Sequence, residues 1–150
     1  SQGFIQQIST TGAVLRMTQG HLKLHVFAGT FASRDEACRF SEPQWEPEPD
    51  ESVDDETYAE WEDRNPGWRL RDELGVGLDE DFIETHFGDD RATYLRRCLV
   101  DADDLHEISR SSPDANTYVL LFPGALRSSD ASLHSTSCAI YCGAFAFRWA

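Results

Sequence analysis

The stretch from Glu42 to Asp63, EPQWEPEPDESVDDETYAEWED, constrains the fold of this chain more than any other feature. Eleven of its 22 residues are Asp or Glu, and none is Lys or Arg. Carboxylates without partners stay in contact with water, because burial would remove the hydration that stabilises them. We therefore expect residues 42–63 to form a solvated loop and helix inserted in the domain, with the core supplied by the segments on either side.

The wider region from Glu42 to Glu107 concentrates most of the charge. It holds 23 of the 27 acidic residues but only six of the 13 Lys and Arg residues, a net charge of −17. The whole chain carries −14 at pH 7. A field of this sign repels nucleic acid and anionic membranes and speeds the encounter with basic proteins. The charge thus predicts a basic protein as partner, and neither nucleic acid nor membrane.

The length and composition predict a single domain over residues 1–150. A hydrophobic content of 40% is enough for a core. No apolar run approaches the roughly 20 residues that a membrane-spanning helix needs, and no signal peptide opens the chain. The four cysteines lack the spacing of a zinc ribbon or a redox motif, which favours a reduced, cytoplasmic protein. They are Cys38, Cys98, Cys138 and Cys142.

Met17 is the only methionine of the chain. It lies just before the first strongly patterned strand. We therefore interpret Met17 as the natural start and residues 1–16 as a leader or an added segment. The alternative is an ordinary N-terminal strand pair with a turn at Gly12.

Three segments near the two ends of the chain have the alternating pattern of β-strands. Leu22–Phe27 alternates apolar and polar residues, and Thr117–Phe122 is apolar enough to be a central strand. Ser135–Trp149 also alternates, but its phase shifts by one residue at Gly143, which predicts a β-bulge or a tight bend. These strands are expected to build one sheet.

Helical signals occupy the region between those strands. Ser33–Glu36 has the spacing of a capping box and starts a short helix that Pro43 stops. A second helix is expected from about Asp54, and Tyr58 and Trp61 share one of its faces because they lie three residues apart. The remaining expected helices are Trp68–Leu74 with Gly75 as its C-terminal cap, Asp90–Val100 and Asp101–Ile108.

The segment Asp79–Phe87, DEDFIETHF, also has the features of a helix. Asp79 can cap its N-terminus, and the two acids that follow favour the positive end of the helix dipole. Its apolar stripe would consist of Phe82, Ile83, His86 and Phe87. We therefore expect an α+β domain. Its mostly antiparallel sheet comes from the N- and C-terminal strands, and short helices from the acidic middle cover one face.

No motif for catalysis or metal binding stands out. The one HxxxH pair, His21 and His25, falls at the predicted strand Leu22–Phe27, where residues four apart lie about 13 Å from each other. No HxH pair, Gly-x-Ser-x-Gly elbow, phosphate-binding loop or EF-hand is present. We therefore expect no catalytic residue, no metal and no cofactor. The alternative from another class is a small carboxylate-based, metal-dependent enzyme that uses the acids of Asp79–Asp90 together with His86.

Aromatic residues punctuate the acidic stretch, and they suggest a docking surface. Trp and Tyr anchor interface hot spots, while carboxylates around them supply complementarity and fast association. The alternative is a solvated segment that is not a docking surface, whose aromatic residues only attach it to the core. The expected partner-binding residues are Trp45, Asp54, Asp55, Glu56, Tyr58, Trp61, Asp79, Glu80, Asp81 and Glu84.

Three short segments resemble the immunity protein 22 family of bacterial polymorphic toxin systems. The first is His25–Phe31, HVFAGTF, followed by a Ser-x-x-Glu helix start, which is similar to the opening strand, glycine and helix of that family. The second is Gly75–Glu84, with DEDFIE. The third is Ile140–Phe145, IYCGAF, which looks like the terminal strand of the family.

This resemblance implies an α+β fold, no enzymatic activity, and neutralisation of a cognate toxin by direct binding. Toxins of such systems are often nucleases, whose clefts are basic because their substrate is a polyanion. The charge of this chain points to the same kind of partner. Another alternative is an adaptor or immunity protein of the SMI1/KNR4-like family. Neither the identity of the toxin nor the oligomeric state follows from the sequence.

Overall fold

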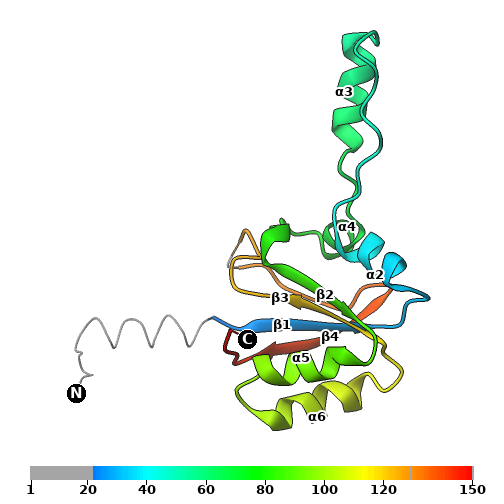
Figure 1. The fold of residues 1–150 in the computed structure, drawn as a ribbon. Helices are drawn as coiled ribbons and strands as arrows, with labels where there is room; N and C mark the ends of the chain where they lie inside the picture. Colours follow the sequence, from blue (N-terminus) through cyan, green and yellow to red (C-terminus); the bar gives the residue numbers. More distant parts are fainter. Residues whose placement is uncertain (1–21, 129, 150) are drawn as a thin grey trace, which may run out of the picture.

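A four-stranded antiparallel sheet with strand order β2-β3-β1-β4 lies at the centre of the protein (Figure 1). The computed structural model describes residues 22–128 and 130–149, so the expected leader and start at Met17 lie outside the described residues. The strands are β1 (Leu24–Gly29), β2 (Ile83–Phe87), β3 (Thr117–Leu121) and β4 (Ala139–Phe145). Helices pack on this sheet, which confirms the α+β class.

The helices begin and end where their capping residues lie. They are α2 (Arg34–Ser41), α3 (Asp55–Arg64), α4 (Arg69–Leu74), α5 (Asp90–Cys98), α6 (Ala102–Ser111) and one 3-10 turn, η1 (Glu80–Phe82). The Ser33 side chain accepts a hydrogen bond from the Glu36 N–H at 3.2 Å, which confirms the predicted start of α2. Gly75 ends α4 with a left-handed φ of 69°, as predicted.

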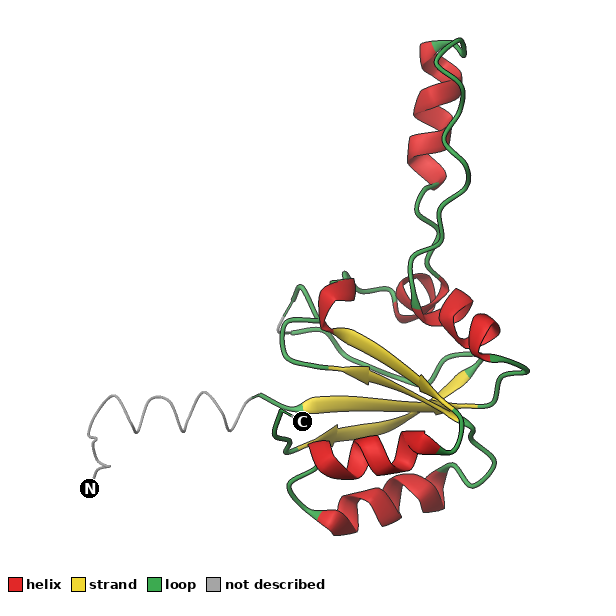
Figure 2. Ribbon diagram, in the orientation of Figure 1, coloured by secondary structure: helices red, strands yellow, loops and turns green. Residues whose placement is uncertain are grey.

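Helices cover both faces of the sheet, so the prediction of one covered face was wrong (Figure 2). On one face, Phe27 and Val119 pack with residues of α2 and α4 such as Phe40. On the other face, Leu120 packs with residues of α5 and α6 such as Leu95. Alternate residues of β1 and β3 therefore enter two separate cores, which explains why β3 is apolar at almost every position.

The prediction of a helix over Asp79–Phe87 was also wrong. Only the turn η1 is helical there, and Ile83–Phe87 forms the edge strand β2, antiparallel to β3. The segment satisfies two periods, because Phe82, Ile83, His86 and Phe87 suit a helix while Ile83, Thr85 and Phe87 suit a strand. Strand pairing selects the strand over the helix. Because β3 is buried, the backbone groups along its outer edge need hydrogen-bond partners, and β2 supplies them. The acidic middle therefore contributes a strand as well as helices.

The phase shift at Gly143 is a β-bulge, as predicted. The β1–β4 register passes from Val26–Gly143 to Phe27–Tyr141, so Cys142 has no opposite residue. Gly143 has a φ of 123°, a conformation that favours glycine. The bulge lets β4 complete the sheet at the edge opposite β2.

The cysteines and the length of the helices bear on the environment of the protein. All four cysteines are free thiols, and Cys98 is buried while the others are partly buried. Within residues 22–128 and 130–149, no helix combines the length and apolar character that crossing a bilayer requires. The cytoplasmic location stays a prediction.

We expect Leu120→Ala to destabilise the protein by about 2–5 kcal/mol, because it leaves a cavity under α5 and α6. The matched control is Leu22→Ala, which removes the same atoms from a side chain that is 42% exposed. That change should stay within about 0.5 kcal/mol. Urea unfolding measures both, and equal effects would contradict the core assigned to this face.

Candidate functional site

The acidic stretch forms an arm that projects from the body of the protein (Figure 1). We define the acidic arm as residues 43–67. Its extended first half runs outward, and α3 returns toward the sheet, so Asp54 lies near the tip. The arm holds ten acidic residues and one basic residue, Arg64. No residue of α3 is buried, as expected for a helix that does not pack against the core.

Two backbone hydrogen bonds close the arm at its base. The Gln44 N–H donates to the Gly67 carbonyl oxygen at 2.7 Å, and the Gly67 N–H donates to the Gln44 carbonyl oxygen at 2.8 Å. Next to this bridge, the indole N–H of Trp68 donates to the Ser41 carbonyl oxygen at 2.8 Å inside the body. The base of the arm is thereby joined to the core beside α2.

Aromatic residues hold the two halves of the arm together. The Trp61 ring lies 6.1 Å from that of Trp45 and 5.5 Å from that of Tyr58. The Trp61 indole also donates to the Glu46 carbonyl oxygen at 3.3 Å. These contacts therefore hold α3 against the extended first half of the arm. Trp45 is 63% exposed, whereas Trp68, which directly follows the arm, is buried in the core.

Several polar contacts inside the arm complete this arrangement. The Arg64 guanidinium donates to both carboxylate oxygens of Glu46, at 3.1 and 3.0 Å. The Tyr58 hydroxyl donates to Glu48 at 2.6 Å, which raises the pKa of Tyr58. The other carboxylates of α3 are exposed and make no ion pair with any residue that the structure describes. They belong to Asp55, Glu56, Glu60, Glu62 and Asp63.

A cleft of about 460 Å³ lies between the base of the arm and the body. Trp45 and Trp68 line it, and the acids Asp79–Asp81 come to it from the turn before β2. Arg71 and Arg127 line it as well, and sequence reasoning missed both. The structure thus brings Asp79–Asp81 close to Trp45, while Asp54–Glu56 lie at the far end of the arm.

Glu84 does not belong to this surface. It lies opposite Leu120 in the β2–β3 pairing and therefore points to the face covered by α5. There its carboxylate accepts hydrogen bonds from the Tyr94 hydroxyl at 2.7 Å and from His86 Nε2 at 2.9 Å. The physical reason is the alternation of a strand, because the predicted helix would have set Glu84 beside Asp81. The expected contact set is therefore split between two faces.

The acids considered for a metal-dependent enzyme are divided in the same way. Asp79–Asp81 line the cleft at the base of the arm, whereas Glu84 and Asp90 lie near His86. In the part of the chain that the structure describes, no three His, Cys, Asp or Glu residues converge as metal ligands do. The geometry thus gives no support to the carboxylate-based alternative.

Comparison of the chain with family models, curated proteins and solved structures finds no match. The resemblance to the immunity protein 22 family therefore stays a prediction. A proposed interface with a basic partner therefore rests on the arm, the cleft at its base and their charge.

We expect Trp61→Ala to loosen the arm without unfolding the body. Among the described residues, its ring contacts and hydrogen bonds are with the arm, so the free energy of global unfolding should change by less than about 0.5 kcal/mol. Cleavage after Glu51 by a Glu-specific protease should become faster, while Trp149→Ala should leave it unchanged; Glu46 and Glu48 precede prolines and are not cleaved. A loss of stability as large as that of Leu120→Ala would contradict this account.

The start of α3 should depend on pH through Asp54. Its side chain accepts the Thr57 N–H at 2.7 Å, and this hydrogen bond lowers the pKa of Asp54. A lowered folded-state pKa means that the cap is fully stabilising above the unfolded value of about 3.9 and is lost as pH falls through the folded value. Amide protection factors in the first turn of α3 should therefore decrease over that range.

The control for this measurement is Asp54→Asn, which keeps a capping oxygen but cannot titrate. The acid-induced decrease in protection at Thr57 should be smaller in this variant. The assignment to Asp54 is wrong if the variant shows the same decrease as the parent protein.

Proposed function

We propose that this chain is an immunity protein that binds a cognate toxin domain and blocks it. In this proposal the toxin is a nuclease, and the acidic arm enters its basic substrate cleft. The observation that carries the proposal is an arm with ten acidic residues and one basic residue that projects away from the body. The catalytic groups belong to the toxin, and this chain supplies none.

The charge and shape of the arm suit a concave, basic partner. Nuclease clefts carry Lys and Arg because their substrate is a polyanion. The ten residues of α3 make a rod about 15 Å long that can enter a groove, which a flat acidic surface cannot do. The carboxylates of α3 without an ion pair are free to meet the cations of the cleft.

The internal contacts of the arm favour binding over mere solubility. Solubility needs charge alone, but the arm also holds the ring cluster of Trp45, Tyr58 and Trp61. This cluster fixes the helix against the extended segment before any partner arrives, so less conformational entropy is lost on binding. A preorganised polyanion is what an inhibitor of a nucleic-acid enzyme requires.

The base of the arm supplies a place for an anchoring contact. Trp45 is exposed there and faces a cleft that Asp79–Asp81 also line. A Lys or Arg side chain of the partner could stack on the indole and pair with these carboxylates. Long-range attraction by the arm would then set the association rate, and the contact at its base would set the dissociation rate.

The direct test purifies the protein encoded beside the gene for this chain, which we expect to contain a toxin domain. An equimolar amount of the protein should abolish cleavage of DNA or RNA by that domain. Absence of a complex and of inhibition would overturn the proposal.

Charge reversal on the arm should slow association with that toxin domain. The variant Asp55→Lys, Glu56→Lys, Asp63→Lys leaves the cap at Asp54 intact. Its association rate should fall by about tenfold or more at low salt, and the salt dependence should become flatter.

The matched control reverses two acids of α6 and one just after it, through Asp103→Lys, Glu107→Lys and Asp114→Lys. It changes the net charge by the same amount but not the arm. Stopped-flow fluorescence measures both rates. Equal slowing in the two variants would show that only the net charge matters, and the arm would lose its assigned role.

Trp45→Ala should act on dissociation. Truncating an exposed tryptophan that anchors an interface costs about 2 kcal/mol or more, which corresponds to a dissociation rate about 30-fold higher. Trp149→Ala is the matched control, because Trp149 is 66% exposed and belongs to a different aromatic cluster. Surface plasmon resonance compares the two, and an unchanged dissociation rate for Trp45→Ala would remove it from the interface.

A further inference from the structure

The two edges of the sheet differ in how their outer backbone groups are paired. At the β4 edge, the Tyr141 N–H donates to Ser135 Oγ at 2.9 Å. Just beyond the end of β4, the Val100 N–H donates to the Ala146 carbonyl oxygen at 3.2 Å. A side chain and a neighbouring segment therefore cover this edge, which is a common protection against pairing with another chain.

The β2 edge directs the backbone groups of alternate residues away from the sheet. The Phe122 N–H donates to the Phe82 carbonyl oxygen at 2.9 Å just before β2. Hydrogen-bonded pairs alternate along an antiparallel ladder, so the even-numbered residues of β2 pair with β3 and the odd-numbered residues direct their N–H and C=O groups outward. The outward residues are Ile83, Thr85 and Phe87.

Few of these outward groups have a partner. The Ile83 N–H donates to the Glu80 carbonyl oxygen, and the Phe87 carbonyl oxygen accepts one long hydrogen bond, 3.4 Å, from Arg34. The other outward groups are the Ile83 C=O, both groups of Thr85 and the Phe87 N–H, and none of them pairs with a residue that the structure describes. All five residues of β2 are partly exposed. This edge can therefore accept an incoming strand.

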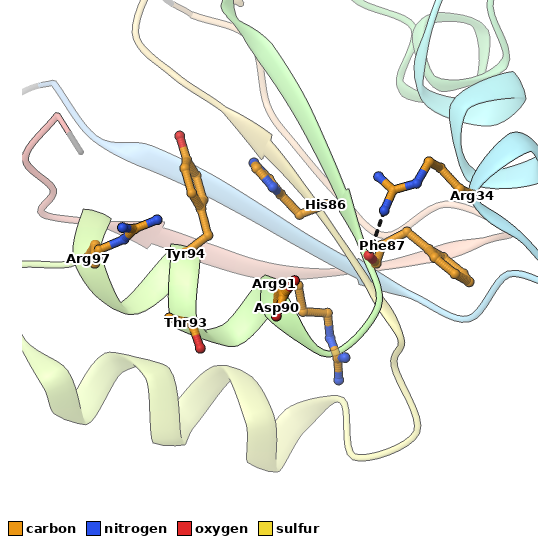
Figure 3. A pocket seen from close by; sticks show the side chains of 8 residues that line it. All are labelled: Arg34, His86, Phe87, Asp90, Arg91, Thr93, Tyr94 and Arg97. Atoms are coloured by element: carbon orange, nitrogen blue, oxygen red, sulfur yellow. Dashed lines mark hydrogen bonds between the residues drawn. The ribbon is translucent and has the colours of Figure 1, made fainter.

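A second cleft, of about 320 Å³, lies at this edge (Figure 3). Arg34 lines it from α2, which packs on one face of the sheet, whereas Tyr94 and Arg97 line it from α5 on the other face. A cleft lined from both faces opens at the edge between them. In Figure 3, Arg34 lies beside Phe87, and Arg97 lies at the opposite end of the cleft with the rings of His86 and Tyr94 between them.

The lining of this cleft is positive although the chain is acidic. Three arginines line it, Arg34, Arg91 and Arg97. Asp90 is the only acidic residue among its lining residues. The Arg91 guanidinium donates to two backbone carbonyl oxygens, at 2.9 and 2.6 Å, and is thereby engaged. Arg34 and Arg97 form no ion pair with any carboxylate in the described part of the chain, so the two ends of the cleft each present a cation.

We propose that β2 accepts an extended acidic segment of another protein as a fifth strand of the sheet. The backbone of that segment pairs with the outward groups of Thr85 and Phe87, as in other cases of strand addition. Its acidic side chains pair with Arg34 and Arg97 through charge-assisted hydrogen bonds. Side chains on one face of a strand are spread along it by about 6.8 Å for every two residues. Cations at opposite ends of a cleft therefore suit an extended ligand.

The charge of the whole chain does not oppose this interaction strongly. Exposed charges more than about 8 Å apart are largely screened at physiological ionic strength, so a short segment in the cleft meets the arginines rather than the acidic arm. The acidic arm of a second copy is a poor occupant of the edge, because Pro43, Pro47 and Pro49 lack the N–H that a ladder requires. The site goes beyond the proposed toxin interface and does not depend on it.

NMR titration of the full chain tests the site with an acetylated and amidated heptapeptide that alternates glutamate with valine. This peptide should bind with a Kd of about 1 mM or lower. The outward N–H groups of Thr85 and Phe87 should then exchange with solvent more slowly, whereas the N–H of His86, which faces β3, should not change. A peptide with glutamine in place of glutamate should bind about tenfold more weakly. Equal binding of the two peptides would overturn the acidic specificity.

Substitutions in the cleft test the two cations. Arg34→Ala and Arg97→Ala should each weaken binding of the glutamate peptide by about threefold or more. The matched control is Arg110→Ala on α6, which removes the same charge from an arginine that pairs with Glu107 outside the cleft. Its Kd should stay within about 1.5-fold of the parent value. The proposal is overturned if Arg110→Ala weakens binding as much as the two variants in the cleft.

Two N-methylated peptides test the pairing of the backbone. One carries the methyl groups on its glutamate nitrogens and the other on its valine nitrogens. Only one of these sets of N–H groups can face β2, so one peptide should bind and the other should not. Equal binding or equal loss would overturn strand addition, as would a dimer formed through β2, seen by sedimentation, without any peptide binding. The triple charge reversal on the acidic arm should not weaken peptide binding, so this site and the proposed toxin interface can fail separately.

Discussion

Strand β3 has to be buried on both faces and paired on both edges, and the rest of the body depends on this requirement. All five of its residues, Thr117–Leu121, are buried. Val119 and Leu121 face the core under α2 and α4, while Tyr118 and Leu120 face the core under α5 and α6. Its outer edge needs hydrogen-bond partners, because unpaired backbone groups are costly away from water. The acidic middle of the chain supplies them as β2.

The same burial requirement explains why the acids project from the body. Both faces of the sheet are occupied by apolar side chains, so a segment with ten acidic residues cannot pack there without losing hydration. The arm is instead held together by contacts among its own aromatic rings, and it exposes its carboxylates. Exposure of charge and a defined shape are therefore consequences of one physical constraint, and together they make the arm suited to a basic cleft.

Charge is also separated over the molecule. The arm holds ten of the 27 acidic residues, whereas Arg34, Arg91 and Arg97 line a cleft beside α5 with only one acid, Asp90. Glu84 is not among the residues that line this cleft, and its oxygen is shared by Tyr94 and His86. Negative and positive surface are thus separated on one small domain.

Features set by neighbouring residues could be predicted from the sequence. The capping box from Ser33 to Glu36, the left-handed Gly75 and the bulge at Gly143 depend only on local backbone chemistry. The solvated acidic stretch followed from its charge. The secondary structure of Asp79–Phe87 could not be predicted from its charge or local chemistry. Its apolar residues fit both the helical and the strand period, and only the pairing with β3 selects the strand. The meeting of Trp45 with Asp79–Asp81, and of Arg34 with residues of α5 around one cleft, was likewise decided by the tertiary structure, since packing joins segments that sequence spacing cannot relate.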